Sequence, residues 1–153
     1  MSVAAIVAAS ASAAGTAFSG NVCSMVAAKQ AAAVHVKLKC KQQKTVKNSG
    51  GTLWTAVWGP ATAVVGPRLS VGVWKVSNPT LLAAMKASHA SGKSVGIGSW
   101  SRESGLANGG TSDGVTFVIR GYLVLITLAT PTGKPLTTPA PLIALSRAVA
   151  NHL

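Results

Sequence analysis

The sequence predicts one α+β domain, in which helices pack on one face of a mainly antiparallel sheet and a helix closes the chain. The length of 153 residues fits a single domain with a core of its own. A hydrophobic content of 48% against 10% charged residues predicts a folded chain rather than a disordered one. The spacing of apolar residues also switches between the period of a helix and the alternation of a strand. We therefore expect the domain at residues 21–153, after an arm of small residues at 1–20.

The arm contains the segment VAAIVAASASAAGTAF, which consists mostly of alanine and serine. This segment is too weakly hydrophobic for a membrane span. It is similar to the apolar region of a secretion signal, although the positive segment with which such signals begin is missing. A flexible or loosely helical arm is the alternative, and the sequence leaves both open.

The first element expected in the domain is a helix at residues 22–33, capped by Asn21. Its apolar residues recur at roughly helical spacing, at Val22, Met25, Val26 and Ala33. At residues 34–40 the pattern becomes an alternation, in which apolar Val34, Val36, Leu38 and Cys40 are separated by His35, Lys37 and Lys39. This alternation predicts a half-buried strand that turns Cys40 to the core and the lysines to water. A polar loop is expected at residues 41–51.

Two strands and a capped helix are expected next. Residues 52–58 and 69–76 are rich in β-branched and aromatic residues, which is typical of strands. Asn78 and Pro79 then predict the cap and first turn of a helix. The inner face of that helix is expected to consist of Leu81, Leu82, Ala84 and Met85.

The last third of the chain predicts an edge strand at 95–100, a long loop at 101–113 and two strong strands at 115–119 and 122–128. A tight turn at Arg120-Gly121 joins the two strong strands, and the second of them is expected to be central because both of its faces are apolar. After an extended, proline-rich connection, Leu142, Leu145, Val149 and Leu153 mark an amphipathic final helix. The two halves resemble each other in outline, so an αββ/αββ pseudo-repeat is one option.

Cys23 and Cys40 are separated by seventeen residues, at the start of the first helix and on the buried face of the first strand. This placement permits a disulfide, which would imply an oxidising compartment. Two buried free thiols are the alternative.

The charge is one-sided, with fourteen Lys and Arg against Glu103 and Asp113, for a net charge of +12. Such a balance favours a polyanionic partner, such as nucleic acid, acidic lipid or a wall polymer. Six lysines gather near the first predicted strand and are the candidate polyanion-binding residues: Lys29, Lys37, Lys39, Lys41, Lys44 and Lys47. Trp54 and Trp58 share one face of their strand and could stack bases beside these lysines, although tryptophans in strands usually belong to the core.

Catalysis is disfavoured, because a paired general acid and base normally takes several carboxylates. A Ser-His-acid triad would draw on His35, His89 or His152, but no serine lies in a Gly-x-Ser-x-Gly turn. Gly96 and Gly98 lack the third glycine and the following helix of a dinucleotide site, so we expect them to shape the backbone. Two cysteines and three scattered histidines do not predict a metal site. We expect a protein that is not an enzyme and has no cofactor.

A family resemblance covers residues 23–153. The chain has a helix opening near Cys23, a strand with Leu53-Trp54, the segment VGIGSW before a hairpin, and a closing PLIALSRAVANHL. In this order of elements it resembles small extracytoplasmic domains of actinobacterial lipoproteins and sensor-like domains of some bacterial membrane kinases. It departs from them in having no lipobox in AFSGNVC, no cysteine two places before Trp54 and only two carboxylates. The resemblance implies a non-enzymatic envelope or ligand-binding module.

The leading functional interpretation is an extracytoplasmic or secreted binding or sensor-like module of the cell envelope that recognises an anionic ligand. The alternative is a structural protein of a virus particle or other assembly, with a cationic surface that faces packaged nucleic acid. The first predicts a monomer with a Cys23–Cys40 bridge, whereas the second predicts an oligomer that retains duplex DNA with a steep salt dependence.

Overall fold

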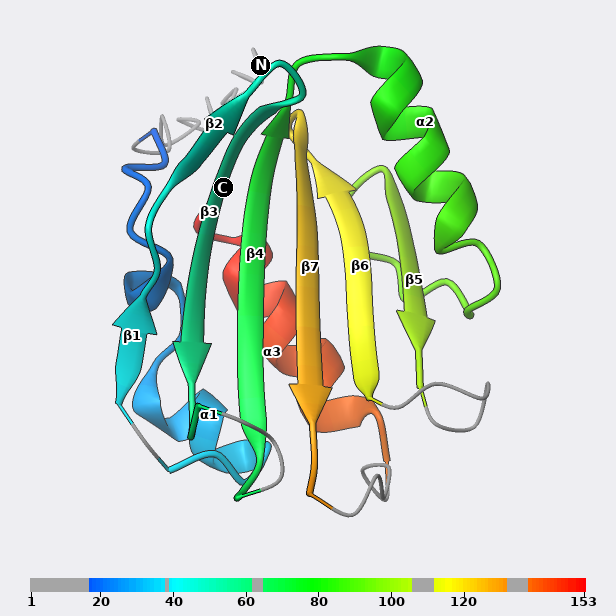
Figure 1. Ribbon diagram of the computed structural model, residues 1–153. Coiled ribbons are helices and arrows are strands. Elements are labelled where there is room, and N and C mark those ends of the chain that lie inside the picture. Colours follow the sequence, from blue (N-terminus) through cyan, green and yellow to red (C-terminus); the bar gives the residue numbers. More distant parts are fainter. Residues whose placement is uncertain (1–16, 38, 62–64, 106–111, 132–137) are drawn as a thin grey trace, which may run out of the picture.

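The computed structural model describes residues 17–37, 39–61, 65–105, 112–131 and 138–153, which form an open antiparallel sheet with helices beside it (Figure 1). The elements are η1 (Val22–Met25), α1 (Ala28–Ala33), β1 (Cys40–Gln42), β2 (Val46–Asn48), β3 (Gly51–Trp58), β4 (Arg68–Val76), α2 (Pro79–Ser88), β5 (Trp100–Ser104), β6 (Asp113–Ile119), β7 (Tyr122–Ala129) and α3 (Ala140–Ala150). The predicted α+β class and the C-terminal helix are confirmed. The predictions for residues 1–16 lie outside the described residues.

The sheet has the order β1-β3-β4-β7-β6-β5, with β2 pairing β3 as well, and every pair is antiparallel. β7 lies between β4 and β6, so its predicted central position is confirmed. From one edge to the centre the order is β1, β3, β4, and from the other edge to the centre it is β5, β6, β7. Each half supplies three positions of the sheet instead of the two strands of the predicted αββ unit, so the strand order does not match that pseudo-repeat.

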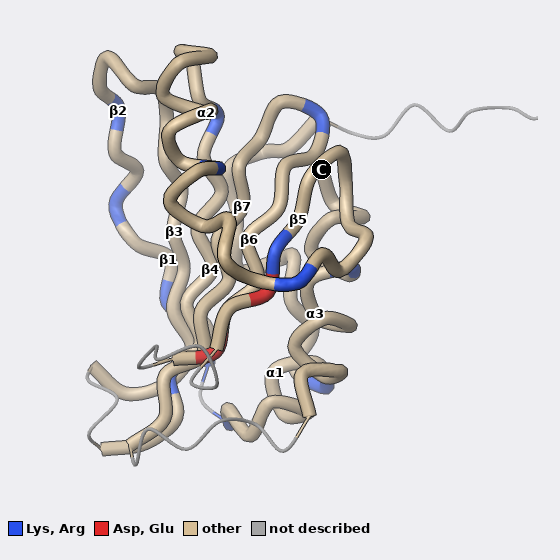
Figure 2. Tube along the Cα trace, turned by 90° about the vertical axis from the view of Figure 1, so that its right-hand side faces the viewer, with Lys and Arg blue, Asp and Glu red and all other residues tan. Residues whose placement is uncertain are grey.

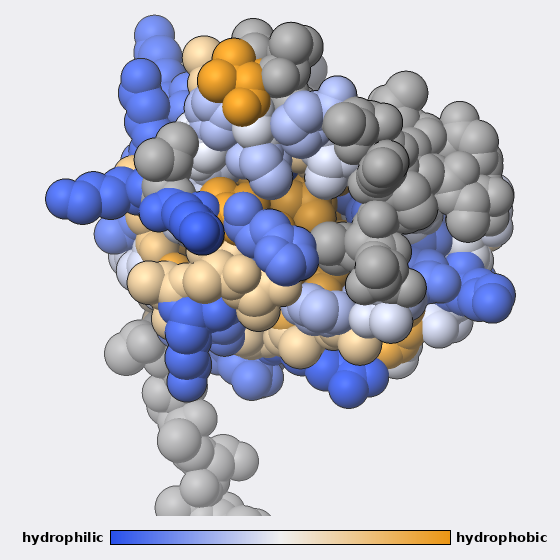
Figure 3. Space-filling view, turned by 90° about the horizontal axis from the view of Figure 1, so that it is seen from below, coloured by the Kyte–Doolittle hydropathy of each residue, from blue (hydrophilic) through white to orange (hydrophobic). Residues whose placement is uncertain are grey.

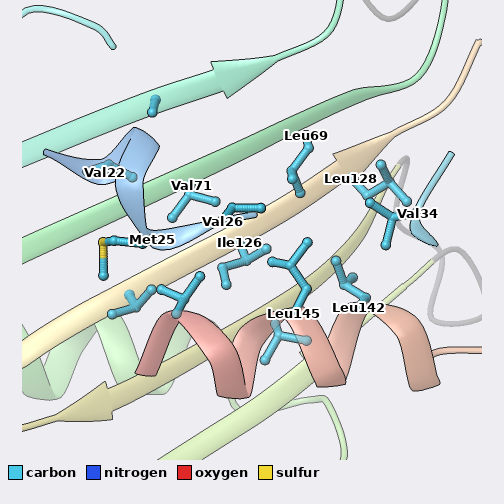
Figure 4. Packing of buried hydrophobic residues seen from close by; sticks show 14 of the residues in the cluster. Val22, Met25, Val26, Val34, Leu69, Val71, Ile126, Leu128, Leu142 and Leu145 are labelled. Atoms are coloured by element: carbon cyan, nitrogen blue, oxygen red, sulfur yellow. The ribbon is translucent and has the colours of Figure 1, made fainter. Parts of the chain in front are cut away.

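The core lies between the sheet and the layer formed by η1, α1 and α3. Alternate residues of the central strands turn to this layer, since Val71 pairs with Ile126 and Leu69 pairs with Leu128. Figure 4 shows these four side chains directed toward Leu142 and Leu145 of α3 and toward η1. The buried residues of α3 include Leu142, Leu145 and Val149, as predicted, whereas Leu153 lies beyond the end of the helix and is half-buried. Burial of each such side chain stabilises the fold by roughly 1.5–3 kcal/mol.

The opposite face of the sheet carries α2, which covers one end of it (Figures 1 and 2). The prediction that the helices pack on one face is therefore wrong for α2. A Cβ added to Gly50 would lie 2.9 Å from Cδ2 of Leu81 and 3.4 Å from the Trp74 ring, so α2 packs beside Trp74. Trp74 follows Val73, a core residue, and therefore points away from α3. Asn78 caps α2 as predicted, because its Oδ1 accepts the Thr80 N–H at 2.8 Å.

The predicted inner face of α2 is only partly right. Leu81, Leu82 and Met85 are half-buried and Ala84 is exposed, and no residue of α2 is fully buried. The helix lies over one end of the sheet rather than in the main core, so one of its sides keeps contact with water.

The predicted helix at residues 22–33 is wrong in its middle. Val26 is extended, with φ −123° and ψ 113°, and separates the 3₁₀ turn η1 from the short helix α1. Asn21 makes no side-chain cap to η1. Instead Oε1 of Gln42, in β1, accepts hydrogen bonds from the backbone N–H groups of Val22 and Cys23, at 3.0 and 3.3 Å. A contact from twenty residues away replaces the local cap.

The predicted strand at residues 34–40 is also wrong, because the hydrogen-bonded strand begins only at Cys40. Val34 ends α1, His35 has a φ of 62°, and the strand begins at Cys40. The alternation of burial is nevertheless present, because Val34 and Val36 are buried whereas His35, Lys37 and Lys39 are exposed. Leu38 lies outside the described residues. The predicted polar loop at 41–51 contains β1 and β2, which are short strands held by β3.

In the second half the predicted edge strand at residues 95–100 is displaced. Gly96 and Gly98 have φ of 66° and 63°, so the chain turns there and β5 begins at Trp100. The segment expected as a loop therefore supplies a strand, and Glu103 and Asp113 lie on β5 and β6. The Arg120-Gly121 turn is confirmed, with φ of 49° and 82°. Positive φ at both central residues is typical of a tight hairpin turn.

Candidate anion-binding site

All six predicted lysines are exposed. Lys41 is in β1, Lys44 lies between β1 and β2, and Lys47 is in β2, while Lys37 and Lys39 precede β1. Figure 2 shows basic positions along the β2–β1 edge of the sheet. Lys29 is on α1, in the helix layer. We call the five lysines outside α1 the cationic edge: Lys37, Lys39, Lys41, Lys44 and Lys47.

The register shows how the strand lysines are spaced. Lys41 pairs with Val57 and Lys47 pairs with Thr52, which lies five positions away on β3. Five positions along a strand correspond to roughly 17 Å. Val57 and Thr52 belong to opposite faces of β3, so the two ammonium groups flank the edge from both sides of the sheet.

Both carboxylates of the chain lie at the other side of the sheet. Glu103 is in β5, which is five strand positions from β1, a separation of roughly 24 Å. Asp113 is in β6, the neighbour of β5. Exposed charges farther apart than about 8 Å are largely screened at physiological salt. The carboxylates therefore do not neutralise the cationic edge.

A purely structural role for these lysines is also physically reasonable. Lysines on an edge strand discourage its unpaired backbone from joining other chains. The structure places Lys41 on such an edge strand. Polyanion binding by the cationic edge therefore stays a prediction, which a comparison of matched variants can test.

The tryptophans belong to the core rather than to a base-stacking surface. Trp58 is 3% exposed. Trp54 is half-buried and meets Phe18 edge to face, with ring centroids 5.3 Å apart. Both rings lie on the helix side of β3, where they stabilise the fold.

Cys23 and Cys40 form a disulfide, with an S–S distance of 2.03 Å and Cα atoms 5.6 Å apart. Of the two alternatives that the sequence leaves open, the bridge is the one present. It ties η1 to the start of β1, at the point where the cationic edge enters the sheet. The pair is compatible with an oxidising, extracellular compartment.

A hollow of about 490 Å³ adjoins the cationic edge, and the sequence reasoning missed it. It is lined by Cys23, Val26, Ala28, Ala31, Ala32, Val36, Lys37, Lys39, Cys40 and Trp58. The sequence carries one signal for it, because α1 reads AKQAAA and alanines leave space beside a helix. Figure 3 views the molecule from below and shows hydrophilic side chains around a hydrophobic centre.

The remaining candidate groups have local roles. His89 Nδ1 lies 2.9 Å from both Ser88 Oγ and the Met85 carbonyl, an arrangement within the end of α2. Gly96 and Gly98 shape the backbone, as expected, and the turn they form is held by Ser101, whose Oγ accepts the Val95 and Ile97 N–H groups. Within the described ranges, no cluster of three or more His, Cys, Asp or Glu side chains could hold a metal ion. No helix in the described part of the chain is long and apolar enough to cross a membrane.

Comparison of the chain with protein-family models, with curated proteins and with solved structures gave no match. We therefore infer the function from the geometry of the described residues.

Proposed function

We propose that this protein is a non-enzymatic binding module of the cell envelope or extracellular space, and that its cationic edge binds an extended anionic polymer. The observation that carries the proposal is the row of five exposed lysines at one edge of the sheet, with both carboxylates toward the opposite edge. The disulfide supports a location in an oxidising compartment.

Counterion release sets the expected strength and salt dependence of binding. Each lysine that neutralises one phosphate of a flexible strand adds roughly 0.7 to the slope of log affinity against log salt. Five lysines of the cationic edge would therefore give a slope of about 3.5 if all take part. The binding should depend little on the sequence or chemical identity of the polymer.

A matched pair of variants tests this proposal. One carries Lys41→Gln, Lys44→Gln and Lys47→Gln on the cationic edge. The control carries Lys86→Gln, Lys93→Gln and Arg120→Asn, which remove the same charge from α2, the loop after it and the β6–β7 turn. Fluorescence anisotropy with labelled inorganic polyphosphate and with a single-stranded oligonucleotide, measured between 50 and 200 mM salt, gives the slopes.

We expect the edge variant to lose about 2 from the slope and at least about tenfold in affinity at the lowest salt, because three phosphate contacts are gone. The control should lose much less. Equal losses in the two variants would show attraction by net charge alone and would contradict the proposal. Separate arms with polyphosphate and the oligonucleotide identify the preferred anionic chain.

The assembly alternative stays a prediction as well. Light scattering on the purified chain at the lowest and the highest salt of the same range distinguishes the assembly protein from the binding module. A monomer that binds polyphosphate agrees with our proposal, whereas a salt-stable oligomer would favour the assembly.

A further inference from the structure

The hollow beside the cationic edge has a mainly apolar wall and is open on one side. Val26, Val36 and Trp58 are between 2% and 6% exposed, and the Cys23–Cys40 disulfide adds its sulfur atoms. The α1 side consists of alanines, whose small side chains do not reach far into the space. The volume of about 490 Å³ falls within the range of sites for small molecules.

Lys37 and Lys39 are the charged residues among those that line the hollow. Both are exposed, and a lysine can lay its alkyl stem along an apolar surface while its ammonium group stays in water. No carboxylate lines the hollow. The complementary ligand therefore has an apolar body and one anionic end.

A second, smaller hollow of about 250 Å³ also has Lys37 in its lining. It is lined by His35, Lys37, Gly59, Pro60, Val65, Gly66 and Pro67. Val65 is 80% exposed, which is unusual for a large apolar side chain. Since Lys37 borders both spaces, its ammonium group can meet the anionic end of a ligand that lies in the first hollow.

We propose that the larger hollow binds the alkyl chain of a free fatty acid, with the carboxylate paired to Lys37 and Lys39. A single hollow with two neighbouring cations fits one chain and one carboxylate. This inference is separate from binding of a polymer along β1 and β2, because it uses the apolar wall with Lys37 and Lys39 and does not need Lys41, Lys44 or Lys47.

Isothermal titration calorimetry with octanoate, decanoate and dodecanoate, each below its micelle concentration, tests the proposal. Each added methylene should tighten binding by up to about fourfold until the hollow is full. Decanol should bind at least about tenfold more weakly than decanoate, because it offers no charge to the two lysines. Equal binding of decanol and decanoate, or no dependence on chain length, would overturn the proposal.

Filling the hollow gives the decisive variant. Ala32 is exposed on α1 and lines the space, so Ala32→Phe should reduce decanoate affinity at least about tenfold without altering the charge. Ala28→Leu provides a second filling variant, and circular dichroism checks that each keeps the fold. The double variant Lys37→Gln, Lys39→Gln should bind decanoate and decanol about equally.

The filling variants also separate this proposal from the previous one. Ala32→Phe should leave the salt slope for polyphosphate unchanged, and the Lys41, Lys44, Lys47 variant should leave decanoate binding within about twofold. Unchanged decanoate binding in both filling variants would refute the hollow as the site. Binding to anionic phospholipid vesicles with none to monomeric decanoate would instead show a membrane surface as the partner and would also refute it.

Discussion

The space where a side chain of Gly98 would lie is already occupied by the carbonyl oxygen of Val118. A Cβ at this position would be 2.0 Å from that oxygen, and the backbone of Gly98 has a φ of 63°. The next residue, Ser99, donates its N–H to the same Val118 oxygen at 2.9 Å. This close approach brings the chain onto the end of β6 directly before β5 begins.

Gly98→Ala should therefore lower the free energy of unfolding by about 3 kcal/mol or more, because a left-handed backbone and a backbone clash act together. Gly96 is the matched control, since its φ is 66° and a Cβ there would meet nothing within 4 Å. Gly96→Ala should cost only about 1 kcal/mol. Urea denaturation of the two variants measures the difference. Equal losses would mean that the approach to Val118 has no energetic weight.

Ser101→Ala should destabilise the protein by about 2 to 4 kcal/mol, because the Ser101 hydroxyl accepts two backbone N–H groups that would lose their partner. The acceptor distances are 3.3 Å from Val95 and 3.1 Å from Ile97, and Ser101 is 2% exposed. Ser146 is equally buried, but its hydroxyl donates to the Leu142 carbonyl within α3. Ser146→Ala should change the stability by less than about 0.5 kcal/mol. Thermal and urea unfolding of both variants decide whether the acceptor role matters.

Reduction of the Cys23–Cys40 bridge should lower the free energy of unfolding by about 3 kcal/mol, because the bridge closes a loop of seventeen residues and so reduces the entropy of the unfolded chain. Unfolding curves with and without dithiothreitol measure this. The double variant Cys23→Ala, Cys40→Ala should match the reduced wild type, and dithiothreitol should have no effect on it. Full stability after reduction would indicate that Gln42 and the core hold η1 without the bridge.

Several strands could be predicted because their signals are local. β3, β4, β6 and β7 are runs of β-branched, aromatic and leucine residues, and the Arg120-Gly121 turn follows from its position between two such runs. β5 has no such signal, because its sequence is WSRES. It is a strand because its backbone pairs with β6, from Trp100 with Val118 to Ser104 with Gly114.

The candidate site divides in the same way. Alternation along the chain predicts that Lys37 and Lys39 are exposed, and the structure agrees. The same pattern does not predict the hollow, which forms where Val26, Val36 and Trp58 come from three separate segments. η1, which precedes the break at Val26, is held by contacts with Gln42 and Cys40, which are far along the chain from it.

By itself the sequence determined the class of the fold, the strongest strands, the final helix and the exposure of the lysines, because periodicity and turn chemistry act within a few neighbouring residues. Tertiary structure decided where β5 lies, which face α2 covers and that a hollow adjoins the cationic edge. Those features arise from pairing and packing between distant segments, whose free energies exceed the weak local preference of any single segment.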